Sequence, residues 1–206
     1  MTQIAVLDYG IGNLRSAQKA FENVEVNAEL TNDPERVLNS DGVVLPGVGN
    51  FGKCAKALWE TGIGDLSLKA ISEGIPFLGI CVGMQLLFES SEESPGVSGL
   101  GVFAGRVKLL TGPIKLPQMQ WNALTVERES KLLQGLDQKW FYFVHSYAVE
   151  QKSADKFITA SCDYGGKVVA AVQKDSTYAT QFHPEKSGNA GRLLLKNFAT
   201  LCKGKK

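Results

Sequence analysis

The sequence predicts an α/β fold whose core is an open parallel sheet with helices on both faces and an antiparallel C-terminal extension. Short apolar runs alternate with helical patterns through the first half of the chain, as in parallel sheets whose strands are joined by helices. The apolar runs are uninterrupted, so the strands are expected to be buried on both faces. In the second half, strand-like segments follow one another without a long helix between them, so antiparallel pairing is expected there.

The first half contains four predicted strands, at residues 4–7, 28–30, 42–45 and 76–80. Helical patterns follow them at residues 14–21, from residue 34, at 53–73 with an interruption near Gly62 and Gly64, and at 84–88. Asp33 before Pro34 is typical of a helix start, because aspartate caps free N–H groups and proline suits the first helical position. This order of elements predicts a flavodoxin-like open sheet.

The second half has six strand-like segments, at residues 102–110, 121–126, 140–149, 157–162, 168–173 and 178–182. Residues 164–167, Tyr-Gly-Gly-Lys, predict a hairpin turn, and residues 188–201 predict a closing helix. These strands either extend the parallel sheet or fold over it. No repeat or linker divides the sequence, so residues 1–206 are expected to form a single domain.

The composition argues against several classes of function. A net charge of +1 gives no basic surface for nucleic acid or an anionic membrane. No apolar run is long enough to span a bilayer, and the strand-like start lacks the basic flank of a signal peptide. The cysteines are scattered without C-x-x-C spacing, which favours reduced thiols, no zinc and a cytoplasmic location. They are Cys54, Cys81, Cys162 and Cys202.

Cys81 lies between two glycines in Gly79-Ile-Cys81-Val-Gly83, after an apolar run and before a helical pattern. This is the pattern of a nucleophile elbow with sulfur in place of the serine oxygen. A sharp strand-to-helix turn holds the central side chain above the sheet, and the flanking glycines let the backbones approach. The helix N-terminus then favours thiolate over thiol. The alternative is a small buried cysteine between two packing glycines.

Two glycine-containing loops are expected near Cys81, because the loops after parallel strands meet at one edge of the sheet. Residues 46–52, Pro-Gly-Val-Gly-Asn-Phe-Gly, either turn tightly or expose N–H groups to a developing oxyanion. Residues 8–13, Asp-Tyr-Gly-Ile-Gly-Asn, lack the third glycine of the dinucleotide fingerprint. A tight turn into a helix is therefore favoured there over nucleotide binding.

His183 is the better candidate of the two histidines as a base for Cys81. It lies at a predicted strand end in Gln181-Phe-His183-Pro-Glu185, and residues two apart in an extended chain point the same way. Glu185 is therefore expected to orient the imidazole, as the third group of a catalytic triad does. His145 alternates with aromatic residues on a predicted strand and is expected to be a hydrogen-bonded site residue or a core residue.

The segments LPGVGNFG, PFLGICVGMQLLFE and QFHPEKS resemble the class I (triad) glutamine amidotransferases and imply their fold. The segments DYGIGNLRS and WFYFVHSYAV, with Lys186-Ser187, are similar to those of the glutaminase subunits of imidazole glycerol phosphate synthase. The resemblance covers essentially the whole chain in order. One departure is Gln118-Met-Gln120-Trp121-Asn122, where the family often has histidine, methionine, glycine, tryptophan and asparagine.

The resemblance implies hydrolysis of glutamine to glutamate and ammonia through a cysteine thioester, without a metal or organic cofactor. It implies that Cys81 is the nucleophile, that His183 is the general base and acid, and that Glu185 orients His183. Further implied residues are Val82 and the Gly47-Val48-Gly49 loop in the oxyanion hole, Gln85, Ser146 and Tyr147 in the glutamine pocket, and Trp121 and Lys186 on the partner interface.

The resemblance also implies a partner, a (β/α)8-barrel cyclase subunit that forms a heterodimer with the chain. The cyclase uses the ammonia to make imidazole glycerol phosphate in histidine biosynthesis. One alternative is a glutaminase of another synthase, such as that of anthranilate; the DYGIGN and HSY segments argue against it. The other is a non-enzymatic flavodoxin-like binding module with a structural cysteine, and the set of Cys81, His183 and Glu185 argues against it.

Overall fold

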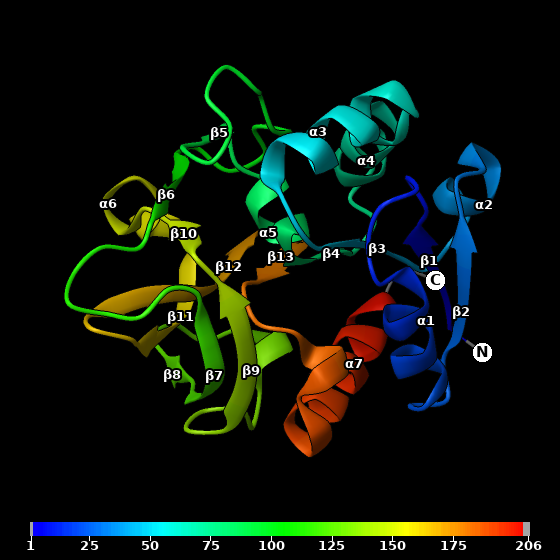
Figure 1. Cartoon of the computed structure of the whole chain (residues 1–206). Helices are drawn as coiled ribbons and strands as arrows, with labels where there is room; N and C mark the ends of the chain where they lie inside the picture. Colours follow the sequence, from blue (N-terminus) through cyan, green and yellow to red (C-terminus); the bar gives the residue numbers. More distant parts are fainter. Residues whose placement is uncertain (1, 204–206) are drawn as a thin grey trace.

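The computed structural model describes residues 2–203, and its core is an eight-stranded sheet with the order β2-β1-β3-β4-β13-β12-β11-β8 (Figure 1). Its strands are β1 (Gln3–Leu7), β2 (Asn27–Thr31), β3 (Gly42–Gly47), β4 (Phe77–Cys81), β8 (Thr125–Val126), β11 (Ile158–Asp163), β12 (Lys167–Lys174) and β13 (Thr177–Thr180). The first four strands and β13 are parallel, and β12, β11 and β8 continue the sheet in antiparallel pairing. The predicted parallel core with an antiparallel extension is confirmed.

Helices cover both faces of this sheet (Figure 1). On one face, α1 (Leu14–Glu22) packs beside α7 (Gly188–Lys203), and the rings of Phe21 and Phe198 lie 6.1 Å apart. The other face carries four helices, α2 (Pro34–Leu38), α3 (Phe51–Glu60), α4 (Ile63–Ser72) and α5 (Val82–Leu86). Because both faces are covered, every residue of β3 and β4 is buried, as their uninterrupted apolar sequences predict.

The remaining strands form two smaller sheets at the C-terminal side of the main sheet (Figure 1). One has the order β10-β6-β5, and the other pairs β7 with β9. Their bounds are β5 (Ser90–Ser91), β6 (Arg106–Leu109), β7 (Gln118–Ala123), β9 (Trp140–His145) and β10 (Tyr147–Val149); the short helix α6 (Gln151–Ala154) follows. The second half therefore both extends the sheet and adds layers beside it.

Four expectations for the second half differ from the structure. The strand predicted over residues 121–126 is divided at Leu124 between β7 and β8, which lie in different sheets. The strand predicted over residues 102–110 forms only from Arg106, because Gly105, with φ 114°, turns the chain just before it. The strand predicted over residues 140–149 breaks at Ser146 into β9 and β10. The strand predicted over residues 178–182 ends at Thr180 and is parallel to β4, because its hairpin with β12 sets its direction.

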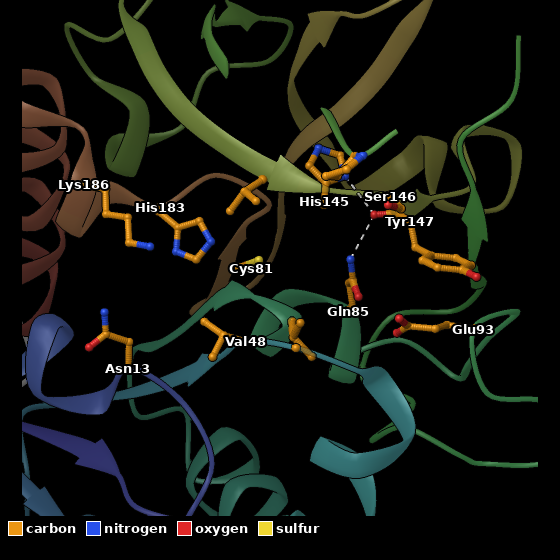
Figure 2. A pocket seen from close by; sticks show the side chains of 14 residues that line it. Asn13, Val48, Cys81, Gln85, Glu93, His145, Ser146, Tyr147, His183 and Lys186 are labelled. Atoms are coloured by element: carbon orange, nitrogen blue, oxygen red, sulfur yellow. Dashed lines mark hydrogen bonds between the residues drawn. The ribbon is translucent and has the colours of Figure 1, made fainter. Parts of the chain in front are cut away.

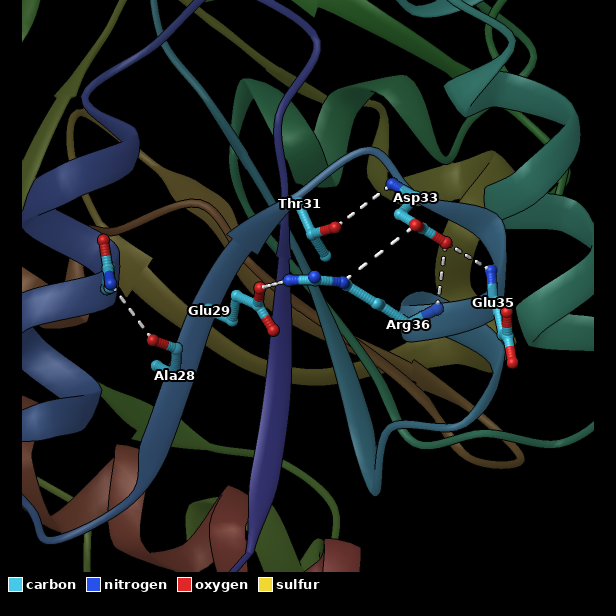
Figure 3. Close-up of polar contacts among 7 residues, drawn as sticks. Ala28, Glu29, Thr31, Asp33, Glu35 and Arg36 are labelled. Atoms are coloured by element: carbon cyan, nitrogen blue, oxygen red, sulfur yellow. Dashed lines mark hydrogen bonds and ion pairs between the residues drawn. The ribbon is translucent and has the colours of Figure 1, made fainter.

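Local signals in the first half act as the sequence predicts. The Asp33 carboxylate accepts hydrogen bonds from the N–H groups of Glu35, at 2.8 Å, and Arg36, at 3.3 Å, and so caps α2 (Figure 3). Arg36 also pairs with Glu29 of β2, which ties the helix to the edge strand. Residues 53–73 are two helices, and Gly62 with φ 73° separates them.

Among the helices of residues 2–203, none has the length and apolar character that crossing a membrane requires.

Candidate active site

The candidate site is a cavity of about 440 Å³ at the carboxyl ends of β3 and β4 (Figure 2). Its lining comes from segments far apart in the sequence: Asn13, Val48, Gly49, Cys81, Val82, Gln85, Glu93, Pro117, Val144, His145, Ser146, Tyr147, His183 and Lys186. The loops after β1, β3 and β4 thus share one crevice, as parallel-sheet topology predicts.

Cys81 is held in a strained backbone conformation between β4 and α5. Its φ of 55° and ψ of −112° are unfavourable for a residue with a side chain. The glycines on either side are required by close approach: a Cβ on Gly83 would lie 1.9 Å from the Leu45 carbonyl oxygen, and one on Gly79 would lie 2.9 Å from the Gly83 oxygen. The predicted elbow geometry is therefore present, and it directs the Cys81 side chain into the cavity (Figure 2).

His183 and Glu185 are in direct contact. The His183 Nδ1–H donates to Glu185 Oε1 at 2.7 Å, and both side chains are more than nine-tenths buried. The extended conformation predicted for residues 183–185 is wrong, because Pro184–Lys186 forms a 3₁₀ turn after His183. The turn still places the carboxylate against Nδ1. The His183 backbone N–H donates to the Tyr142 carbonyl of β9 at 3.0 Å, which fixes the turn beside the cavity.

The charge environment of His183 favours the imidazolium. Burial alone lowers the pKa of an imidazole, yet the neighbouring Cys81 and Glu185 raise the pKa of His183 to about 10. Because Nδ1–H is bonded to Glu185, the remaining ring nitrogen, Nε2, is the one that can exchange a proton with Cys81. Within residues 2–203, Nε2 has no partner at hydrogen-bond geometry. The thiol and the imidazole are thus arranged as a nucleophile and base whose orientation a carboxylate fixes.

Gln181 is a site residue that the sequence analysis quoted but did not assign. Its Nε2 donates to the Cys81 Sγ at 3.7 Å, and its Oε1 accepts a hydrogen bond from Gln85 Nε2 at 3.0 Å. Both glutamines are buried. The amide of Gln181 therefore stabilises negative charge on the sulfur and links the thiol to the pocket residue Gln85.

The loop after β3 approaches the elbow closely. A Cβ on Gly47 would lie 2.6 Å from the Gly83 nitrogen, so only glycine fits between the loop and the start of α5. Gly49 has φ +89°, a conformation that side chains disfavour. Val48, Gly49 and Val82 line the cavity, whereas Gly47 packs behind them. The candidate oxyanion residues are therefore grouped around Cys81.

The predicted glutamine pocket residues meet where β9 breaks at Ser146. Ser146 and Tyr147 line the cavity opposite Cys81, and the Tyr147 carbonyl accepts from Gln85 Nε2 at 3.0 Å (Figure 2). Both N–H groups of Gln85 are thus used by the protein, with Gln181 as the second acceptor. Gln85 can offer a ligand only its amide oxygen and otherwise acts by orienting its neighbours.

Glu93 brings a carboxylate to the cavity that the sequence analysis did not single out. Glu93 lies at the edge of the cavity (Figure 2), and its Oε2 accepts the Phe51 N–H at 2.7 Å, which ties the polar loop of residues 90–99 to the start of α3. No periodicity marks this residue, because the loop has the polar composition of any surface turn. Only the fold shows that the Glu93 carboxylate lies at the N-terminus of α3, which is distant from Glu93 in the sequence.

His145 lies in the cavity wall and is neutral. Its Nδ1–H donates to the Tyr147 carbonyl at 2.8 Å, and burial lowers its pKa to about 4. This agrees with its expected part as a hydrogen-bonded site residue rather than the base.

The candidate partner surface is the outward face of β7 and β9. Trp121 is 47% exposed and Met119 is 62% exposed, and Trp140 extends the same apolar face. The Lys186 Nζ lies 5.7 Å from the centre of the Tyr142 ring, and Tyr142 also contacts Trp121. Gln120 lies in regular β7–β9 pairing opposite Phe143. Trp121 and Lys186 are therefore parts of one exposed surface at the rim of the cavity.

Comparison with known proteins agrees with this geometry. Residues 5–202 match the family Glutamine amidotransferase class-I. The chain is 48% identical to imidazole glycerol phosphate synthase subunit HisH of Acinetobacter baylyi, with 96% of this chain and 98% of the relative covered. It is 45% identical to the protein of the same name from Methanothermobacter thermautotrophicus, with coverage of 97% and 99%.

Solved structures share the fold at low sequence identity. A structure described as a glutamine amidotransferase has a TM-score of 0.77 at 21% identity and covers 97% of this chain and 98% of its own. The glutaminase domain of Trypanosoma brucei CTPS with bound acivicin has a TM-score of 0.69 at 18% identity, with coverage of 100% and 96%. The chain belongs to the class I glutamine amidotransferases and, within them, to the family of imidazole glycerol phosphate synthase subunit HisH.

Proposed function

We propose that the chain hydrolyses glutamine at Cys81 and supplies the ammonia to a cyclase subunit for the synthesis of imidazole glycerol phosphate in histidine biosynthesis. The observation that carries the proposal is the elbow cysteine in one cavity with the His183–Glu185 pair, which lies at 2.7 Å. A structural cysteine needs neither a strained backbone nor a carboxylate-oriented imidazole beside it. Family membership supports the same activity and argues against a binding module.

The reaction proceeds in two halves. The Cys81 thiolate attacks the side-chain carbonyl carbon of glutamine, and the N–H groups of Val82 and of the Gly47–Gly49 loop stabilise the oxyanion. The C–N bond then breaks, and His183 gives its proton to the leaving ammonia. His183 next takes a proton from water, whose oxygen attacks the thioester, and glutamate leaves as the thiolate re-forms. No step needs a metal or an organic cofactor.

The cavity offers charges that suit the substrate. Glutamine carries an ammonium and a carboxylate at its α-carbon, and Glu93 places a carboxylate at the far side of the cavity from His183 (Figure 2). We assign Glu93 to the α-ammonium. Backbone groups of Ser146 and Tyr147 suit the other charged group of the substrate, its α-carboxylate. The Gln85 amide holds this wall of the cavity in place.

The partner proposal rests on the exposed face of β7 and β9. Exposed tryptophan and methionine side chains are typical of protein interfaces, and this face borders the cavity from which ammonia must leave. We propose that a cyclase with a (β/α)8-barrel fold docks there in a heterodimer, in the cytoplasm. Direct transfer follows from chemistry, because ammonia released into water at neutral pH is protonated and no longer nucleophilic.

We further propose that the partner switches the site on through the loop at residues 46–49. Gly47 lets the Gly47–Val48 peptide rotate between presenting a carbonyl and presenting an N–H at little steric cost. One missing oxyanion donor reduces the rate by about 10²–10³-fold. The alternative is a permanently formed hole in which the glycines only permit a tight turn.

The experiment measures glutamate release by the chain alone and with the cyclase and its ligand. Glutamine hydrolysis is expected to rise by at least about two orders of magnitude in the complex, matching one oxyanion donor. Cys81→Ala is expected to abolish glutamine-dependent synthesis while ammonia-dependent synthesis continues. A free chain that already works at the rate of the complex contradicts the switch. A Cys81→Ala protein that still releases glutamate contradicts the proposed function.

Lys186→Glu tests the docking surface. Charge reversal there is expected to reduce the stimulation by the cyclase, because Lys186 packs over Tyr142 on the proposed interface. Lys69→Glu on α4 is the matched control, since α4 lies on the opposite side of the molecule from β7 and β9 (Figure 1). Equal effects of the two reversals would place the interface elsewhere.

A further inference from the structure

Two buried side chains that the proposed reaction does not use lie beneath the loop at residues 46–49. Tyr9 is 2% exposed and follows β1, and Cys54 is fully buried in α3. They come from different elements, Tyr9 from the segment after the neighbouring strand β1 and Cys54 from the helix that the loop enters, and their side chains interact with each other. Neither side chain lines the cavity, so neither can contact a substrate there.

Each side chain holds a carbonyl of the loop. The Tyr9 hydroxyl donates to the Pro46 oxygen at 2.8 Å, and the Cys54 thiol donates to the Val48 oxygen at 3.3 Å. A peptide unit is planar, so fixing its carbonyl also fixes its N–H. Tyr9 therefore fixes the Pro46–Gly47 unit, and Cys54 fixes the Val48–Gly49 unit.

The unit between these two is Gly47–Val48, and neither side chain holds it. Among residues 2–203, no hydrogen bond engages the Val48 N–H. A peptide unit can rotate without moving its neighbours only if the chain on both sides is anchored. The two carbonyl contacts provide those anchors, and Gly47 supplies the torsional freedom at one end.

Both donors keep their protons at neutral pH. Burial raises the pKa of Tyr9 far above its usual range, and the neighbouring Cys54 and Cys81 add to this. Burial and the proximity of Cys81 and Glu93 likewise raise the pKa of Cys54. The hydroxyl and the thiol therefore stay donors while Cys81 and His183 exchange their proton.

We propose that Tyr9 and Cys54 are positioning residues that clamp the oxyanion loop by holding the carbonyls before and after the Gly47–Val48 peptide, and so confine the rotation of the loop to that peptide. The inference rests on the proposed glutaminase function, since it concerns the donor to the oxyanion. In the clamped loop, the Val48 N–H moves between two defined orientations. Without the clamp, the whole segment reorients, and the N–H spends less time aimed at the oxyanion.

The test compares Tyr9→Phe and Cys54→Ala with matched controls. Tyr178→Phe and Cys202→Ala remove the same groups from buried residues near α7, away from the loop. In the complex with the cyclase, each clamp variant is expected to lower kcat for glutamine about tenfold with KM nearly unchanged, because a misaimed donor loses part of its value. Cys54→Ser keeps a donor and is expected to recover most of the rate.

Hydrogen exchange measured on the free chain makes the clamp testable without catalysis. The Gly47 amide, which lies in the ladder of β3 with β4, is expected to exchange at least about tenfold faster in Tyr9→Phe and Cys54→Ala, since local opening becomes easier, and to be unchanged in both controls. Unchanged exchange at this amide, or an equal rise in the controls, overturns the clamp. If wild-type protein fails to hydrolyse glutamine, the proposed function fails, and the exchange result still decides the clamp.

Discussion

The two histidines face the same cavity and are both buried, yet the imidazole of His183 is charged and that of His145 is neutral. His183 places Nδ1–H against the Glu185 carboxylate and has a pKa raised to about 10. His145 places Nδ1–H against the Tyr147 carbonyl and has a pKa lowered to about 4. Burial disfavours the imidazolium in both, so the difference comes from the anionic partners, which only His183 has. The charged neighbours of each imidazole, and not its position in the cavity, therefore identify His183 as the base.

The largest expected effect separates the two residues by activity. His183→Ala is expected to lower glutamine hydrolysis by roughly 10⁴- to 10⁶-fold, the range found for losses of triad members, because the thiol loses its proton acceptor. His145→Ala removes only a hydrogen bond in the cavity wall and is expected to cost about tenfold or less. Steady-state glutamate release in the complex measures both, with the circular dichroism spectrum of each variant chain as the folding control. A reversed order would assign the base to His145.

The next effect isolates the anion that distinguishes His183. Glu185→Gln keeps the size of the side chain but removes its charge, and it is expected to lower kcat for glutamine by about 10²-fold. Combined with His183→Ala, it is expected to add little, since grouped catalytic residues lose activity non-additively. Additive losses in the double variant would mean that Glu185 acts independently of the imidazole.

The Cys81 thiol also contributes to the difference between the pKa values of the two histidines. Cys81 is a cause of the raised pKa of His183, so Cys81→Ala is expected to bring that pKa down toward the ordinary value of 6.5. The pKa of His145 is expected to stay low, because burial sets it. Histidine NMR titration of the two proteins reports both residues. A His183 that titrates identically with and without the thiol would exclude a close thiolate–imidazolium pair.

The smallest effect concerns stability in acid. The pKa of His145 is about 4 in the folded chain and 6.5 in the reference state, so the unfolded chain binds the proton more readily between these values. The contribution of the neutral, buried His145 to the free energy of unfolding is therefore complete above pH 6.5 and declines as the pH falls toward 4. Linkage gives a loss of about 2 kcal/mol between pH 7 and 5.

Urea unfolding at pH 7 and pH 5 measures this decline. Wild type is expected to lose more stability than His145→Gln over the same interval, because glutamine does not titrate. The sign is opposite for His183, whose raised pKa contributes stability at low pH that is lost as the pH rises through about 10. Equal losses in wild type and His145→Gln would contradict a neutral buried imidazole at position 145.

The elbow was predictable from the sequence because its physics is local. Cys81 must adopt an unfavourable φ, and only glycines at positions 79 and 83 leave room for the backbones that cross there. The alternation of strands and helices likewise gave the sheet edge on which the loops converge. The His183–Glu185 contact was predicted with the wrong local geometry, since a 3₁₀ turn and not an extended chain brings the groups together.

Residues that join through tertiary contacts were not predictable in the same way. Glu93 reaches the cavity because its loop caps α3, and Gln181 reaches the thiol because β13 lies beside β4. Tyr9 and Cys54 look like ordinary buried residues in the sequence. Their hydrogen bonds to the loop follow from the order of β1 and β3 in the sheet, which one sequence does not encode in any short pattern.

Active-site labelling with a glutamine-like chloroketone tests the central claim most directly. A thiol displaces the chloride fastest when the reagent is bound beside it and when a neighbouring base accepts the proton of the thiol. Mass spectrometry is expected to find the label on Cys81 in wild type and in His145→Ala, with Cys54, Cys162 and Cys202 unmodified, and to find little label in His183→Ala. Equal labelling of all four thiols in the folded protein, or labelling lost in His145→Ala and retained in His183→Ala, would contradict the account.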